Sequence, residues 1–341
     1  MLPFWVECMR TKRCLKQERR PDQTGIYPRK GWIVHTEIEV IIPSSRTDGL
    51  IEDLQQMDDV ISLSVVREAS IKPPGDVFTV HALNRGADDV MKLADAARED
   101  GQVSVSTSEL TSLVDPQHER KVANDVDEAL WEEVETDLRH HGKLTTNYLG
   151  LMALGGAVAA TGFAAESSSQ AISFVAASII APGFEPLAAL PIGLALRRWG
   201  VIGRGLQSVL GGYLALTLSA ALVFLALRVT GVVVVEEFTV NTEVRNLAEP
   251  GLREILLSGC GALAGMVMLL SRRHYLIPGA LVALLVIEAS ALIGVALAAG
   301  EPGLMLEGAK RFGLDILLIV VGGVPIVLLK QALVHRRAPM V

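Results

Sequence analysis

The hydrophobic and polar positions of this 341-residue chain follow two different patterns. Up to about residue 110, short apolar stretches alternate with polar positions or recur at helical spacing. From residue 143 onward, the chain contains a series of apolar runs. Their lengths approach or exceed the roughly 20 residues needed to cross a bilayer. The first pattern predicts a soluble α+β domain, and the second predicts an α-helical polytopic membrane domain.

Strict alternation marks the start of the soluble domain. In residues 33–43, Ile38, Val40 and their neighbours at even positions share one face, while Glu37 and Glu39 share the other, which predicts a half-buried strand. Further strands are predicted at residues 60–66, 77–83 and 102–106, helices after Ser45 and over residues 87–97, and a turn at residues 72–76. The order βαββαβ within residues 32–110 predicts a ferredoxin-like domain, which is often a regulatory unit but does not by itself establish a function.

A charged stretch, residues 115–142, connects the two patterns. It is predicted to form one amphipathic helix, because apolar residues recur every four positions: Val122, Val126, Leu130, Val134 and Leu138. Its apolar face either lies on its own domain or pairs with a second copy of the chain. The second alternative predicts a homo-oligomer.

Six apolar segments are predicted in the membrane domain, residues 143–337, at residues 144–165, 170–195, 206–229, 255–270, 276–299 and 313–329. Basic residues favour the cytoplasmic side. If the N-terminus is inside, the inner flanks hold Lys143, Arg197, Arg198, Arg204, Arg272, Arg273, Lys330, Arg336 and Arg337, and the outer flanks hold Arg228, Arg245, Arg253, Lys310 and Arg311. This bias predicts an inner (plasma) membrane protein with both termini cytoplasmic. A re-entrant second segment, the alternative, would invert every later segment.

The second segment is interrupted in its middle by Pro182, Gly183, Pro186 and Pro191, and Glu185 stands among them. Proline removes a backbone donor, and backbone groups freed at membrane depth are tolerated only inside protein or beside a water-filled cavity. We therefore expect two half-helices that meet at a break within residues 181–186. Broken helices of this kind form the binding sites of many transporters.

Six residues are candidates for a transport or ion pathway: Glu185, Glu288, Ser178, Pro182, Gly183 and Pro186. Glu288 is included because residues 288–297, EASALIGVAL, resemble residues 185–196, EPLAALPIGLAL, and three segments in each half would make a 3+3 inverted repeat. A carboxylate in the bilayer core costs about 2.5–3.5 kcal/mol on insertion scales and usually faces a cavity. The structural alternative for Glu185 is a carboxylate bonded to loosened backbone. Asp315 is expected to reach the outer interface.

Composition and charge narrow the function classes. Half of the residues are hydrophobic and the mean hydropathy is +0.39, while residues 32–140 hold 24 acidic against 9 basic residues, which argues against nucleic acid as a partner. Three scattered cysteines form neither a metal site nor a disulfide framework. Because no catalytic motif is present, we expect no enzyme, cofactor or metal. Residues 1–31, with a net charge of +5, are interpreted as a disordered extension or an over-long start, and contact with anionic lipid is the alternative.

The stretch ASIIAPGFEPLAALPIGLALRRW resembles the hallmark of a family of hydrophobic membrane proteins catalogued as domain of unknown function 389. The positions that carry the resemblance are Ala181, Pro182, Pro186 and Gly193, and it covers roughly residues 135–300. Ser178 and Glu185 stand where the family pattern has Met or other apolar or small residues. The resemblance therefore implies the architecture, a small soluble region before a membrane part, and implies no role for Glu185.

The leading functional hypothesis is a secondary transporter or permease with a cytoplasmic regulatory domain. It would move a small solute or ion, with intramembrane carboxylates as proton- or cation-coupling groups. The alternative hypothesis is a membrane-anchored sensor or scaffold, whose soluble domain binds a ligand or partner and whose membrane part only holds it in the bilayer.

Overall fold

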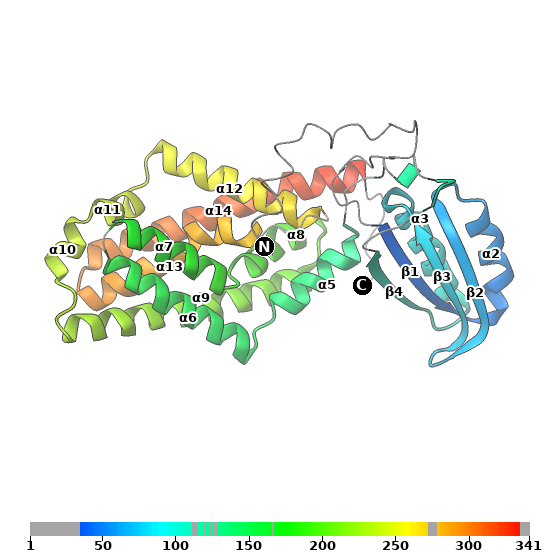
Figure 1. The fold of residues 1–341 in the computed structure, drawn as a ribbon, viewed down its shortest axis with the longest axis horizontal. Helices are drawn as coiled ribbons and strands as arrows, with labels where there is room; N and C mark the ends of the chain where they lie inside the picture. The colour runs from blue at the N-terminus through cyan, green and yellow to red at the C-terminus, as the bar shows by residue number, and fades with distance from the viewer. Residues whose placement is uncertain are drawn as a thin grey trace, which may run out of the picture. The chain divides into compact units, whose positions relative to one another are not determined.

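The computed structural model describes residues 35–110, 115–118, 121, 122, 125, 129–165, 167–271 and 278–334 (Figure 1). The predicted N-terminal extension, residues 1–31, lies outside these ranges. The described elements fall into an N-terminal α/β region and a C-terminal region that is mostly helical. Both parts agree with the division that the two sequence patterns predict.

The α/β region contains a four-stranded antiparallel sheet in the order β2-β3-β1-β4 (Figure 1). Its elements are β1 His35–Ile42, η1 Ser44–Arg46, α2 Thr47–Gln55, β2 Val60–Ile71, β3 Pro74–Ala82, α3 Asn84–Ala96, η2 Ala97–Asp100 and β4 Ser104–Leu110. In the centre of the sheet Ile38 lies opposite Val80 of β3 and Thr107 of β4. The predicted four-stranded antiparallel sheet is confirmed.

Both helices of this region cover the same face of the sheet. The residues at even positions of β1 are buried together with the inward residues of β3, α2 and α3 in one cluster: Ile38, Val40, Ile42, Phe78, Val80, Leu50, Leu54, Val90 and Met91. Period-two alternation places these strand residues on one face. Removal of this apolar surface from water, at about 25 cal/mol per Å², is what holds the helices on the sheet.

Strand β2 continues past its predicted end, Val66, because a side chain supports an irregular step there. Its register shifts between Val66 and Ser70, and Glu68 has a positive φ of 52°. The Asp76 carboxylate, on a residue that is 1% exposed, accepts a hydrogen bond from the Glu68 N–H at 2.8 Å. It also accepts hydrogen bonds from the hydroxyls of Ser44 and Thr47, each at 2.6 Å. The Glu68 N–H and these two hydroxyls hold the pKa of Asp76 below its ordinary value.

An Asp76→Asn variant is expected to destabilise the α/β region by about 1.5–3 kcal/mol at neutral pH, the usual contribution of hydrogen bonds to a charged group. Because the folded-state pKa is lowered, the stabilisation is complete above the unfolded pKa of about 3.9 and is lost as the pH falls through the folded value. Hydrogen–deuterium exchange of peptides from residues 35–110, corrected for intrinsic rates, measures the difference on the full chain at pH 7 and pH 3.5.

Asp48→Asn is the matched control for Asp76→Asn, since the Asp48 side chain is 82% exposed and forms a surface pair with Arg67. It should leave exchange unchanged at both pH values. The account of Asp76 is wrong if these peptides exchange as slowly in Asp76→Asn as in the wild type at pH 7. It is also wrong if the difference in exchange between the variant and the wild type is as large at pH 3.5 as at pH 7.

The helical region follows. Its helices are α5 Trp131–His141, α6 Thr146–Phe163, α7 Ser167–Ile180, α8 Phe184–Ala195, α9 Trp199–Val229, α10 Val235–Val240, α11 Thr242–Ala248, α12 Leu252–Leu270, α13 Pro278–Ala299 and α14 Pro302–Leu333 (Figure 1). Among the described residues, α9, α12 and α14 are long and apolar enough to cross a membrane, and the bent pair α7–α8 makes a fourth if it is one span. Helices α6 and α13 occupy the places of the first and fifth predicted segments.

Glycines let the central helix α9 approach its neighbours on two sides. A Cβ on Gly156 of α6 would lie 2.2 Å from the Leu216 carbonyl oxygen, and a Cβ on Gly294 of α13 would lie 2.1 Å from that of Thr217. The hydroxyl of Thr217 also lies 2.9 Å from that of Ser290 on α13. Small residues at helix crossings permit backbone contact of this kind in membrane domains.

The predicted single helix over residues 115–142 is wrong. In that range α5 begins only at Trp131, and Asp125, Ala129 and Leu130 are not helical. Their polar groups bond elsewhere: the Ala129 N–H donates to the Leu270 carbonyl at 3.2 Å, and the Asp125 carboxylate accepts from the Asn84 N–H at 2.7 Å. The apolar residues of the four-residue repeat also belong to two different hydrophobic clusters. Leu130 packs with the core of the sheet, whereas the apolar residues of α5 pack with the core of the helical region.

Candidate functional site

The second apolar segment is broken where the sequence predicts. Helix α7 ends at Ile180 and α8 begins at Phe184, and the two are bent by 58° relative to each other. The Ala181 N–H still bonds the Ala177 carbonyl at 2.9 Å, but the next residue, Pro182, has no N–H to donate. The Gly183 N–H donates instead to the Ala181 carbonyl, only two residues earlier, at 2.8 Å. The helical ladder therefore stops over residues 181–183.

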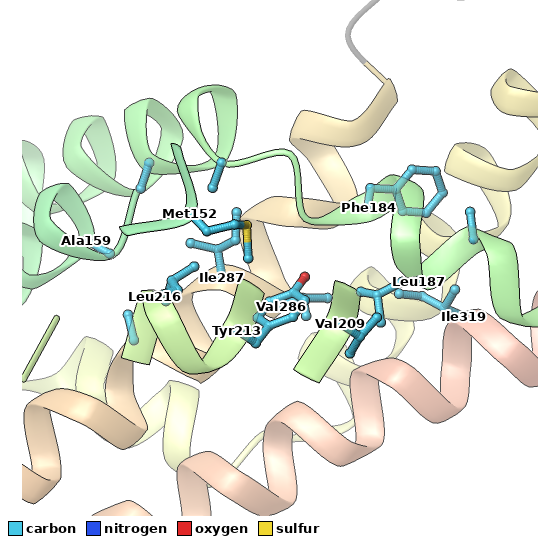
Figure 2. Close-up of a cluster of buried hydrophobic side chains, with 14 of the residues drawn as sticks. Met152, Ala159, Phe184, Leu187, Val209, Tyr213, Leu216, Val286, Ile287 and Ile319 are labelled. Carbon is cyan, nitrogen blue, oxygen red and sulfur yellow. The ribbon is translucent and has the colours of Figure 1, made fainter. Parts of the chain in front are cut away.

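A tyrosine from α9 satisfies the backbone freed at the break. The Tyr213 hydroxyl donates to the Gly183 carbonyl oxygen at 3.1 Å, and the residue is 4% exposed. Figure 2 shows this hydroxyl pointing away from α9, beneath the stretch that leads into Phe184. A Cβ on Gly183 would lie 2.6 Å from the hydroxyl oxygen. A larger residue at this position would therefore have to displace the phenol from the break.

Glu185 lies in the first turn of α8, where a carboxylate interacts favourably with the helix dipole. The residue is half-buried and its Oε2 atom is buried. Its charge interacts electrostatically with the phenols of Tyr148 on α6 and Tyr213 on α9. Tyr148 in turn donates to the Ser208 carbonyl at 3.0 Å. The carboxylate therefore has polar groups of two other helices near it.

The other predicted residues take different places. Ser178 is buried in α7 and donates to the Val175 carbonyl at 2.8 Å. Pro182 is half-buried in the break, and Pro186 is buried in the first turn of α8, where a missing N–H costs little. Ser178, Pro182, Gly183, Glu185 and Pro186 thus gather along one short stretch around the break.

Glu288 lies on α13, the helix that passes the break. Its neighbour Ile287 is 3.7 Å from the position of a Cβ on Gly183, and Glu288 itself is half-buried. The two stretches that resemble each other in sequence differ in structure, because Glu185 opens a half-helix whereas Glu288 lies inside the continuous helix Pro278–Ala299.

Sequence reasoning missed a buried ion pair on α14. Arg311 and Asp315 are each 2% exposed, and the guanidinium Nε donates to Asp315 Oδ2 at 3.1 Å. Arg311 Nη2 also donates to the hydroxyl of Ser258 on α12. Asp315 is therefore enclosed by protein, and Arg311 is not an exposed flanking charge. The available signal was their spacing, since residues four apart on a helix face each other.

Tyr213 links the break to this ion pair. Its hydroxyl bonds the Gly183 carbonyl at the break, and its ring centroid is 4.9 Å from that of Phe312, the residue next to Arg311. We call the set the polar centre, which consists of Tyr148, Glu185, Tyr213, Ser258, Arg311 and Asp315. Within the described part of the chain, no group of three or more His, Cys, Asp or Glu side chains is placed to hold a metal ion.

A family model matches the part of the chain that holds the break and the ion pair. Residues 178–321 match the domain of unknown function DUF389. The expected resemblance is confirmed over this DUF389 region, which starts later than residue 135 and ends beyond residue 300. Of the polar centre, only Tyr148 lies outside the region. Comparison with curated proteins and with solved structures finds no match.

Proposed function

We propose that the helical region is a secondary transporter or permease, in which a small solute or ion passes the break and Glu185 exchanges a proton during transport. The observation that carries this proposal is the interrupted helix at residues 181–183, which has a carboxylate in the next half-helix and a tyrosine on its freed carbonyl. Irregular backbone at membrane depth occurs where it is enclosed by protein or lines a cavity. Ionisable groups in such places mark solute and proton pathways.

The finer architecture belongs to the same proposal. We take α6, the pair α7–α8, α9, α12, α13 and α14 as six crossings of the plasma membrane. Two sets of three would then form the inverted repeat. We also take the α/β region as a ferredoxin-like cytoplasmic domain, supported by the sheet order β2-β3-β1-β4 with a helix in each crossover.

The chemistry follows from the groups that face Glu185. When the carboxylate is charged, the N-terminal end of α8 lowers the energy of that charge. When water is excluded, the protonated form is favoured. A change in access to one side of the membrane therefore changes the proton occupancy of Glu185, which is what proton coupling requires.

Flux measurements on the purified full chain in liposomes test the proposal. With an imposed pH gradient and a pH-sensitive dye inside, a screen of small solutes should find at least one whose uptake acidifies the lumen faster than in protein-free vesicles. Wild-type vesicles that show no solute-dependent flux across the screen contradict transport.

The orientation gives an independent prediction. Reporter fusions after Val240 should report the outer side, and fusions after Arg273 should report the cytoplasm, because the inner ends of the predicted segments are flanked by more basic residues than the outer ends, also when the buried Arg311 is left out. A fusion after Asp100, in the α/β region, is the control and should report the cytoplasm. The reverse pattern at the first two sites would support a re-entrant α7–α8 pair instead of a crossing.

A cavity favours the alternative function, a membrane-anchored sensor. It has a volume of about 540 Å³ and is lined by residues of β4 and α5 together with Arg98, among them Thr107, Glu109, Glu132 and Asp137. A pocket of this size suits a small ligand, and its acidic lining suits a cationic one. The sensor hypothesis predicts that a polyamine such as spermidine stabilises the full chain while no solute crosses the liposome membrane.

A further inference from the structure

Arg311 is buried in the helical region with only part of its hydrogen-bonding capacity used. A guanidinium carries five N–H donors and is always charged in proteins. Nε is bonded to Asp315 and Nη2 to Ser258, while Nη1 is buried and has no hydrogen-bond partner among the described residues. Asp315 Oδ1 is likewise buried and without a partner there. Leaving a buried polar atom unpaired costs about 1–3 kcal/mol.

A purely structural ion pair would be arranged differently. Buried pairs offset the loss of hydration only when further hydrogen bonds satisfy their remaining donors and acceptors. Here Ser258 fixes the guanidinium from α12 and Asp315 fixes it from its own helix. The orientation of the group is therefore set, while Nη1 has no partner in the described part of the chain. A donor that is held in place but unused is the arrangement of a binding site.

The surroundings restrict what could bind. Phe312, next to Arg311, packs its ring against Tyr213. One turn earlier, a Cβ on Gly308 would lie 3.3 Å from atoms of Ile293 and Leu292 on α13, so that α13 and α14 are in close contact there. This close packing one turn from Arg311 favours a small ligand over a large one. Planar oxygen edges match a guanidinium better than other acceptors do.

We infer that Arg311 binds a small oxyanion, of the size of formate or nitrate, through the edge of the guanidinium that Asp315 and Ser258 leave unused. Asp315 and Ser258 are positioning residues, because they hold the guanidinium and do not themselves supply the donor. The role of this anion as the transported solute rests on the proposed transport function. Binding at Arg311 does not depend on that function.

The test is a thermal unfolding titration of the purified full chain in detergent. Sodium formate replaces sodium gluconate, a bulky anion, at constant ionic strength. A ligand that binds the folded state raises the unfolding temperature in a saturable manner, and wild type should show this with formate. Arg311→Lys keeps the charge next to Asp315 but lacks the planar fork, and its apparent affinity for formate should fall at least tenfold.

Two further variants make the outcome decisive. Arg311→Gln combined with Asp315→Asn removes both charges together, so that neither is left unpaired, and should abolish the formate effect. Lys310→Gln, at an exposed neighbouring cation paired with Glu307, should leave it unchanged. A saturable formate effect that survives in the double variant, or none in wild type, overturns the anion site. Formate binding at Arg311 in a protein without any flux would instead overturn the transport proposal alone.

Discussion

Glu185→Gln is expected to abolish the pH dependence of solute flux in liposomes while the protein still folds and inserts. Glutamine has the shape of the protonated carboxyl group, so that it keeps the neutral hydrogen-bonding state in the first turn of α8. It cannot release a proton. If Glu185 couples protons to transport, flux in the variant should not respond to a pH gradient of two units, whereas wild-type flux should change severalfold.

The structural alternative for Glu185 predicts a different result. If the carboxylate serves only to stabilise the turn at the break, Glu185→Gln lowers the unfolding temperature and leaves the pH dependence of flux unchanged. Glu236→Gln, at an exposed position of helix α10, is the matched control and should change neither quantity. A stable Glu185→Gln protein with wild-type pH dependence would exclude the coupling role.

Gly156→Ala is expected to have the largest effect on stability. The new Cβ would lie 2.2 Å from the Leu216 carbonyl oxygen and 2.9 Å from its carbon. These are backbone atoms in the middle of α9, so that no side-chain rotation relieves the clash, and α6 must move away from α9. Overpacking of a tight contact typically costs about 1–3 kcal/mol and occasionally more. The unfolding temperature of the purified protein should fall by several degrees.

Gly150→Ala is the control for this prediction because it lies on the same helix and has nothing within 4 Å of its Cβ position. Its unfolding free energy should stay within about 1 kcal/mol of wild type, since alanine is the better helix former. Equal unfolding temperatures for Gly156→Ala and Gly150→Ala would show that α6 and α9 are not in backbone contact at this level.

The sequence predicts those parts of the fold that depend on local patterns. Alternation in residues 35–42 is visible because one face of β1 is buried and the other carries Glu37 and Glu39. The break was predictable because Pro182 removes a donor inside an apolar segment. The presence of a proline alone does not locate the break, because two other prolines of this segment lie within α8. Pro186 fits the first turn of that helix, and Pro191 lies inside it.

Other parts depend on contacts between distant segments, which no local pattern shows. The apolar repeat through Leu130 predicts one helix, yet Ala129 bonds the Leu270 carbonyl far along the chain. The role of Tyr213 depends on Gly183, thirty residues earlier. The sequence predicts Arg311 to be a flanking charge, because an arginine near the end of an apolar run is typical of an interface. Its burial depends on Ser258 of another helix.

The central claim is that the break at residues 181–183 lines a solute pathway, and the reactivity of a cysteine beside it tests this most directly. Ser178→Cys, in a chain whose three native cysteines are replaced by serine, is exposed in sealed proteoliposomes to a charged thiol reagent that does not cross lipid. Ala220→Cys, which lies two turns beyond Tyr213 on α9 and packs in the helical core, is the control. We expect the Ser178→Cys variant to react with the reagent applied from the outer or the luminal side, and the control to stay unmodified. A Ser178→Cys variant that is as unreactive as the control from both sides would contradict the account.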